Sequence, residues 1–311
     1  MTTAFITHKD CLGHITPDQH PETKDRLISI LKAIEDIDNQ DLVRESAPLG
    51  NEKDILRVHP LNYIKKITSE SPSKGIKALD ADTFMSPGSL TAAYRSVGAV
   101  VRAVDLVMGK KVSNAFAAIR PPGHHAEKEI SMGFCFFGNV AIATSYALEH
   151  YGLSRVAVVD FDVHHGNGTQ DLLWDETRTL FVSSHQSPLW PGTGRSTETG
   201  GSNNIINLPL DPNTDGKEFR AIYEKAVFPA LESFSPELII ISAGFDAHIA
   251  DPLANLNFTN QDFEWVTERL CDVADFCCGG RIVSTLEGGY DLEALAASVK
   301  LHLEVLLRRG H

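Results

Sequence analysis

The segment VAVVDFDVHHGNGT (156–169) places two aspartates and two adjacent histidines directly after a run of small β-branched residues. Side chains alternate between the faces of a strand, so Asp160, Asp162 and His164 point to one side if the extended backbone continues that far. Buried carboxylates without a partner are costly, and a bound cation is the natural way to stabilise them. An Asp–His hydrogen bond at a strand end is the simpler alternative.

Asp246 supports the metal interpretation, because it follows another apolar run in the polar stretch AGFDAHIADP (243–252). Two carboxylates and one imidazole, with no thiolate, are ligands for zinc, with iron(II) and cobalt as alternatives. Three protein ligands leave a position for water, which is the catalytic rather than the structural pattern. A cation lowers the pKa of such a water toward neutrality, and the sequence therefore predicts hydrolysis.

Two further histidines, His124 and His125, stand side by side in RPPGHHAE (120–127). One could accept a proton from the water while the other donates a proton or stabilises charge. A histidine pair packed in a loop is the alternative. Asp160 and Asn167 are within plausible reach of the two imidazoles, and a carboxylate raises imidazole basicity more than an amide does. We therefore expect the two histidines to differ in basicity.

Tyr290 follows two glycines in EGGY (287–290), on a loop that can approach another backbone closely. Its phenol could donate a hydrogen bond to an oxyanion that develops opposite the metal. A tyrosine that only caps the core is the structural alternative.

The elements that position these residues are short apolar runs alternating with amphipathic segments. Continuous β-branched runs, typical of strands buried on both faces, occupy residues 3–7, 115–119, 155–161, 179–184, 237–242 and 281–286. Helical patterns occupy residues 22–36, 86–108, 138–151, 215–234, 259–278 and 291–309. The predicted fold class is α/β: a single three-layer domain, residues 1–311, with a mostly parallel central sheet flanked by helices. The polar motifs directly follow the predicted strands. In open parallel sheets, ligand-binding and active sites form at these carboxyl ends of the strands.

Composition narrows the class of partner. The 311 residues carry a net charge of −13, which argues against nucleic-acid binding and suits a cationic partner. Neither a signal peptide nor an apolar run of membrane-span length is present, so no membrane association is expected. Five cysteines without zinc-ribbon spacing indicate reduced thiols in a cytoplasmic protein. A homo-oligomer is compatible with this composition.

The motifs together resemble those of the histone deacetylase family, which includes bacterial deacetylases, acetylpolyamine amidohydrolases and acetoin-utilisation proteins. The resemblance runs from about Phe5 to Leu307 and is closer to class II than to class I. It rests on HPETKDRL (20–27), DADTFMSPGS (80–89), RPPGHHAE, GFCFFGNVAIA (133–143), DFDVHHGNGT (160–169), SSHQSPLWPGTG (183–194), AGFDAHIADPL (243–253) and EGGYDL (287–292). The resemblance implies an arginase/deacetylase-like fold and a zinc-dependent amidohydrolase that removes acetyl or related acyl groups from lysine side chains.

By position, the resemblance also implies roles for the residues already singled out. The expected zinc ligands are Asp162, His164 and Asp246. The expected catalytic residues are His124 and His125, with their respective partners Asp160 and Asn167, and Tyr290, which polarises the amide carbonyl. The second histidine is implied as the main general base and acid. A structural potassium ion is implied beside the zinc, held by Asp160, Asp162, His164 and Ser183.

The implied substrate tunnel is narrow and aromatic, with Phe134 and Trp190 as its walls and Gly133 as a further contact. Leu253 matches a position at the mouth where an acidic residue favours polyamines, so it favours acyl-lysine or a neutral substrate. Asp82 matches a rim carboxylate that binds substrate amides. An acetylated lysine peptide or protein is thus the implied partner, with acetylpolyamines or other small acylated amines as the alternative. Hydroxamates are expected inhibitors.

Two other classes of function compete with this interpretation. A binuclear manganese hydrolase of the arginase type needs a D-x-D pattern where this chain has Asp246-Ala247-His248, so His248 favours a single metal. A non-catalytic binding module usually lacks a ligand, a base or the tyrosine, and all are present here. The polar stretch 193–204 has no apolar side chain to pack and is expected to be a mobile rim loop.

Overall fold

The structure is a computed structural model that describes residues 2–37 and 40–310. Its centre is an eight-stranded sheet in the order β2-β1-β5-β10-β9-β6-β7-β8, in which every neighbouring pair is parallel. The strands are β1 (Thr3–Thr7), β2 (Leu42–Ser46), β5 (Asn114–Ala117), β6 (Val156–Asp160), β7 (Thr179–Gln186), β8 (Ile205–Leu210), β9 (Leu238–Ala243) and β10 (Ile282–Leu286). A separate antiparallel pair joins β3 (Lys77–Ala78) and β4 (Phe84–Met85).

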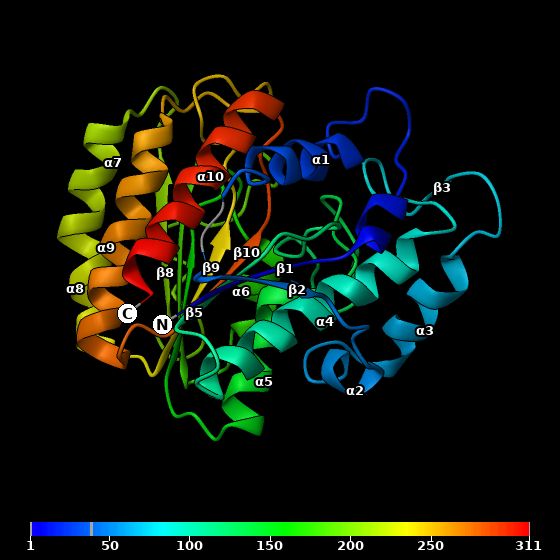
Figure 1. Cartoon of the computed structure of the whole chain (residues 1–311). Coiled ribbons are helices and arrows are strands. Elements are labelled where there is room, and N and C mark those ends of the chain that lie inside the picture. Colours follow the sequence, from blue (N-terminus) through cyan, green and yellow to red (C-terminus); the bar gives the residue numbers. More distant parts are fainter. Residues whose placement is uncertain (1, 38–39, 311) are drawn as a thin grey trace.

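Helices cover both faces of the sheet (Figure 1). One face is covered by α1 (Lys24–Ala33), α7 (Gly216–Ile222), α8 (Phe228–Phe234), α9 (Asn260–Cys278) and α10 (Leu292–Arg309). The other face is covered by α4 (Ser89–Met108) and α5 (Asn139–His150). Further helices are α2 (Glu52–Ile55), α3 (Leu61–Glu70), α6 (Asn167–Leu173) and the short 3₁₀ turn η1 (Lys9–Gly13). The predicted three-layer α/β architecture is confirmed.

The central strands β6 and β9 are largely apolar because both of their faces are buried. In β9, Ile239 and Ile241 pack in the core under α9 and α10. Leu238 and Ile240 pack in the core under α4 and α5. Alternate side chains of this strand thus enter different hydrophobic cores, which favours apolar residues at successive positions.

Several elements differ from the sequence-based prediction. The edge strands β2 and β8 were not expected, because β2 is half-exposed and β8 contains Pro209, which is tolerated at an edge. The helix predicted over 215–234 contains a π-helical segment, η2 (Tyr223–Val227), between α7 and α8. Within the described residues, no helix is long and apolar enough to cross a membrane.

The extended run that begins in β6 ends at Asp160 rather than continuing to His164. Side-chain-to-backbone hydrogen bonds replace it: the N–H of Asp162 donates to Asp160 Oδ1, and the N–H of His164 donates to Asp162 Oδ1. Aspartate favours such turns because its carboxylate accepts from the backbone two residues further on. The polar residues therefore lie in a loop at the carboxyl end of the sheet, beside the loops that follow β9 and β10.

Candidate metal centre and active site

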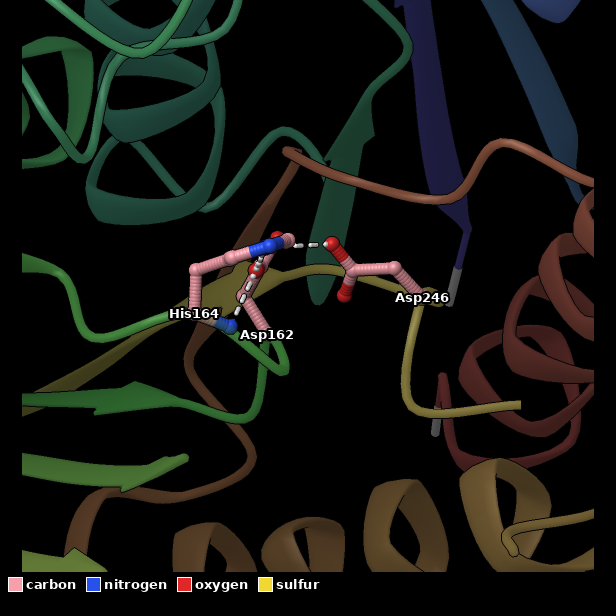
Figure 2. A group of neighbouring side chains, drawn as sticks. All are labelled: Asp162, His164 and Asp246. Atoms are coloured by element: carbon pink, nitrogen blue, oxygen red, sulfur yellow. Dashed lines mark hydrogen bonds and ion pairs between the residues drawn. The ribbon is translucent and has the colours of Figure 1, made fainter. Parts of the chain in front are cut away.

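Asp162, His164 and Asp246 meet at the carboxyl ends of β6 and β9, which are neighbours in the sheet (Figure 2). His164 Nδ1 lies 3.0 Å from Asp246 Oδ2 and 3.2 Å from Asp162 Oδ1. The candidate ligand atoms of the three residues all lie within 4.8 Å of one another. Among the described residues, this is the one group of three or more acidic, histidine or cysteine side chains close enough to hold a metal ion.

The two carboxylates of this triad are buried without a lysine or arginine partner among the described residues. Backbone N–H groups of His164 and Gly288 donate to Asp162, and that of Val163 donates to Asp246. Burial and the charge of Asp162 raise the pKa of Asp246 to about 7. A divalent cation would relieve both the desolvation and the repulsion of the two carboxylates, so this donor set fits zinc or a related metal.

Glycines keep space free around the same oxygens. A Cβ atom on Gly288 would lie 2.5 Å from Asp162 Oδ2 and closer still to Asp246 Oδ2. A Cβ atom on Gly244 would also overlap Asp162 Oδ2. The backbone therefore approaches the triad from two sides without a Cβ atom in between. Glycine is common where the chain passes this close to a ligand.

The tandem histidines lie beside the triad, with their rings 3.9 Å apart. His124 donates from Nδ1 to Asp160 Oδ2 at 3.0 Å, and His125 donates from Nδ1 to Asn167 Oδ1 at 2.8 Å. The structure thus brings together the two pairs expected from the sequence. Both imidazoles are buried, and the residues that face them differ in charge.

The pKa values of the two histidines differ in the predicted direction. Burial would lower the pKa of His124, but the charges of Asp162 and Asp160 raise it to about 10. Burial and the neighbouring His124 hold the pKa of His125 well below its ordinary value. In the chain alone, His124 is therefore a cation, and His125 is a neutral imidazole able to accept a proton.

Tyr290 is held at the site by its backbone. Its N–H donates to Asp251 Oδ2 at 2.7 Å, and Asp251 Oδ1 accepts from the N–H of Leu253 at 3.0 Å. The guanidinium of Arg26 lies 4.8 Å from the centre of the Tyr290 ring and donates to the carbonyl of Gly289. Burial raises the pKa of Tyr290 well above its ordinary value, so the phenol keeps the proton it would donate.

Aromatic rings lie against the second histidine and the tyrosine. The Phe134 ring lies 5.9 Å from that of Tyr290, and the Trp190 ring lies 4.7 Å from that of His125. A Cβ atom on Gly133 would lie 2.6 Å from the Trp190 ring and closer still to the His125 ring, so only glycine fits between these two side chains. Asp82 Oδ1 accepts from the N–H of Gly133 at 3.2 Å, which places this carboxylate beside the Gly133–Phe134 turn.

Other residues singled out from the sequence lie as follows. Ser183 pairs with Asp160 across β6 and β7, and its hydroxyl bonds to His185 Nδ1 at 2.9 Å. His248 Nδ1 accepts from the N–H of Ala250, outside the triad, so it adds no ligand.

The 193–204 loop, which has no apolar side chain to pack, is held by polar contacts. Glu198 accepts from Gln170 Nε2 at 2.8 Å and from the N–H of Gly194 at 3.0 Å, and Asn204 is buried. These polar contacts pack the loop against α6 in place of apolar side chains.

Sequence reasoning missed four charged residues that support the site. Arg26 and Asp251 hold the Tyr290 loop, as described above. Glu287 Oε2 accepts from the N–H groups of Gly123 and His124, at 2.7 and 3.1 Å, and Glu127 contacts Asn167. All four lie inside motifs that were already singled out from the sequence. A charged residue in such a motif without an assigned role could therefore have indicated a supporting residue.

Comparison with known proteins agrees with this geometry. Residues 20–306 match the model of the histone deacetylase domain. A probable deacetylase of Archaeoglobus fulgidus is 36% identical over 299 residues, which cover 94% of this chain and 82% of that protein. A histone deacetylase-like amidohydrolase of Pseudomonas aeruginosa is 38% identical over 278 residues, which cover 88% and 72%.

A solved structure agrees as well. The crystal structure of the HDA15 HD domain superposes with a TM-score of 0.93 and 31% identity, covering 99% of this chain and 88% of that one. The fold, the matched residues 20–306 and these relatives lead to one conclusion: the chain belongs to the histone deacetylase family, whose members are deacetylases and related amidohydrolases.

Proposed function

We propose that this protein is a zinc-dependent amidohydrolase that removes acetyl or related acyl groups from lysine side chains. The observation that carries the proposal is the arrangement of Asp162, His164 and Asp246 beside the tandem histidines and Tyr290. This set combines ligands for a Lewis-acidic metal ion, a proton acceptor and a hydrogen-bond donor for an oxyanion, with aromatic side chains beside them.

A divalent cation held by the triad would supply an activated water and polarise the amide carbonyl. His125 is neutral, so it accepts the proton of the attacking water and returns it to the departing amine. Tyr290 donates from its hydroxyl to the oxyanion that forms when the water adds to the amide carbon. The amide C–N bond then breaks, and acetate and a free amine leave.

His124 is the electrostatic partner in this scheme. Asp160 accepts from its Nδ1 and keeps it charged in the chain alone. A potassium ion held by Asp160, Asp162, His164 and Ser183 would make His124 less basic, because a nearby cation disfavours the protonated imidazole. The adjacent register of Asp160 and Ser183 is compatible with such an ion.

The substrate class depends on the mouth of the site. Leu253 is half-buried and uncharged, and Asp251 fixes its backbone. A leucine offers nothing to the second ammonium of a polyamine, whereas it can pack against the aliphatic chain of a lysine. We therefore place an acetyl-lysine peptide first and an acetylpolyamine second.

Parallel assays test this order. Zinc-loaded protein is given an acetyl-lysine peptide or an acetylated polyamine at equal concentration, and free amine is measured. Faster turnover of the peptide supports the proposal, and faster turnover of the polyamine contradicts the interpretation of Leu253. A hydroxamate, whose two oxygens can chelate a metal, is expected to inhibit both reactions.

A further inference from the structure

Glu127 lies behind the partner of His125. Asn167 receives the Nδ1–H of His125 on its Oδ1 and donates from Nδ2 to Glu127 Oε1 at 2.8 Å. The same Nδ2 lies 3.4 Å from the sulfur of Met132. A chain of hydrogen bonds therefore runs from the buried imidazole through a buried amide to a carboxylate near the surface.

The carboxylate removes an ambiguity that an amide alone would leave. The oxygen and nitrogen ends of an asparagine side chain have almost the same shape, so either end could face His125. Glu127 is acceptor-only when ionised, so the Nδ2 end must face it. The Oδ1 end then faces His125 and accepts its Nδ1 proton.

This orientation decides which nitrogen of His125 is free. A neutral imidazole carries one proton, and a proton held at Nδ1 leaves the lone pair at Nε2. A reversed amide would present N–H groups to Nδ1 and would favour the proton on Nε2. His125 could then no longer accept a proton at Nε2.

The contact is built into the loop between the tandem histidines and the substrate wall. The N–H of Glu127 donates to the carbonyl of Ile130, which closes the loop and directs the side chain back toward Asn167. His124 needs no such device, because its partner Asp160 is itself a carboxylate and can only accept. The two histidines thus reach a fixed tautomer by different means.

We propose that Glu127 is a positioning residue: it fixes the Asn167 amide and, through it, the Nδ1-protonated form of His125. The inference rests on the proposed function in so far as His125 is the proton acceptor. Its structural part, the amide orientation and the tautomer, holds for any reaction at this site.

A double-mutant cycle tests the link. Glu127→Ala is expected to lower kcat by about tenfold to a hundredfold with little change in KM, the usual effect of losing a residue that orients a functional histidine. Glu127→Gln supplies a side chain that can either accept from Asn167 or donate to it, so it fixes the amide less well; a partial loss of kcat, smaller than in Glu127→Ala, is expected. Glu129→Ala is the matched control, because Glu129 lies in the same loop and its carboxylate accepts from the exposed Asn62 rather than from Asn167.

In the Asn167→Asp background, Glu127→Gln is expected to raise activity rather than to lower it. The substitution sets two carboxylates at hydrogen-bond distance, and their repulsion is expected to lower activity strongly. Adding Glu127→Gln supplies a donor to the introduced carboxylate. The double variant is expected to have a kcat about tenfold higher than Asn167→Asp alone, because one such contact is regained. A purely structural role for Glu127 would make both backgrounds respond alike, which would overturn the proposal.

Nitrogen NMR of histidine-labelled protein separates this inference from the proposed function. The wild-type chain is expected to show His125 protonated on Nδ1, and Glu127→Ala is expected to show a mixture of tautomers. If no acylated amine is hydrolysed but the tautomer still shifts, the proposed function fails and the role of Glu127 holds. An unchanged tautomer together with an unchanged kcat in Glu127→Ala would overturn the inference.

Discussion

Gly288→Ala is a steric probe of the proposed metal centre. Gly288 does not have a positive φ, so alanine fits its backbone. The added Cβ would lie 2.5 Å from Asp162 Oδ2 and closer to Asp246 Oδ2. Ordinary contact begins at about 3.5 Å, so the carboxylates must move by about 1 Å.

A shift of this size exceeds what a metal site tolerates. Ligand distances in working sites stay within about 0.2 Å of their ideal values. Both carboxylates are buried and fixed by backbone N–H donors, so the strain cannot be relieved into solvent. We expect zinc affinity to fall by about a hundredfold or more, beyond the usual cost of disturbing groups around a metal. The free energy of unfolding is expected to fall by only about 1–3 kcal/mol, as for other overpacked cores.

Competition with a chromogenic chelator measures the affinity, and thermal unfolding of the zinc-free chain measures the stability. Gly13→Ala is the control, since its Cβ would meet nothing closer than 4.0 Å and Gly13 does not have a positive φ. Wild-type zinc affinity in Gly288→Ala would show that the cation does not lie between Asp162 and Asp246.

Three further predictions follow from the same structure. Tyr290→Phe is expected to lower kcat by about 10²–10³-fold with little change in KM, as for other lost oxyanion donors, and retained activity would exclude its role. Leu253→Glu is expected to raise the ratio of acetylpolyamine to peptide turnover, and an unchanged ratio would exclude Leu253 from the mouth. Glu22→Gln leaves Arg26 and Arg120 buried without their carboxylate, so it is expected to cost about 3–5 kcal/mol in chemical denaturation. Burial alone would raise the pKa of Glu22, but Arg120 holds it well below 4.5, so its stabilisation exists above about pH 4.5 and disappears as the pH falls. The variant is expected to lose this acid-dependent part of the stability curve, and an unchanged acid dependence would contradict the assignment.

The sequence revealed the central strands because burial on both faces leaves a simple pattern. Leu238–Ala243 is apolar at every position up to Ser242, and such a run has few alternatives to a buried strand. The same physics exposes the candidate site: carboxylates and imidazoles directly after such a run, as at Asp162 and Asp246, require a partner. The composition of the site could therefore be predicted before its geometry.

What could not be predicted depends on contacts between distant segments. Strand β2 is polar on its exposed positions and resembles a loop until its pairing with β1 is known. Glu127 and Asn167 are 40 residues apart, and no local pattern indicates that their side chains meet. Arg26 and Arg120 are fully buried, against the usual tendency of arginine, because Glu22 and backbone carbonyls accept from both. Such charges become interpretable only when all of their partners are in place.

The most direct test of the account is a zinc titration of the metal-free chain. Bound zinc and acetate release from an acetyl-lysine peptide are followed together in the wild type and in Asp246→Asn. We predict one zinc per wild-type chain, with acetate release rising in proportion to it, and weak binding with little release in the variant. Full activity of the metal-free wild type, or equal zinc binding and turnover in Asp246→Asn, would contradict the assignment of Asp162, His164 and Asp246 as the catalytic metal centre.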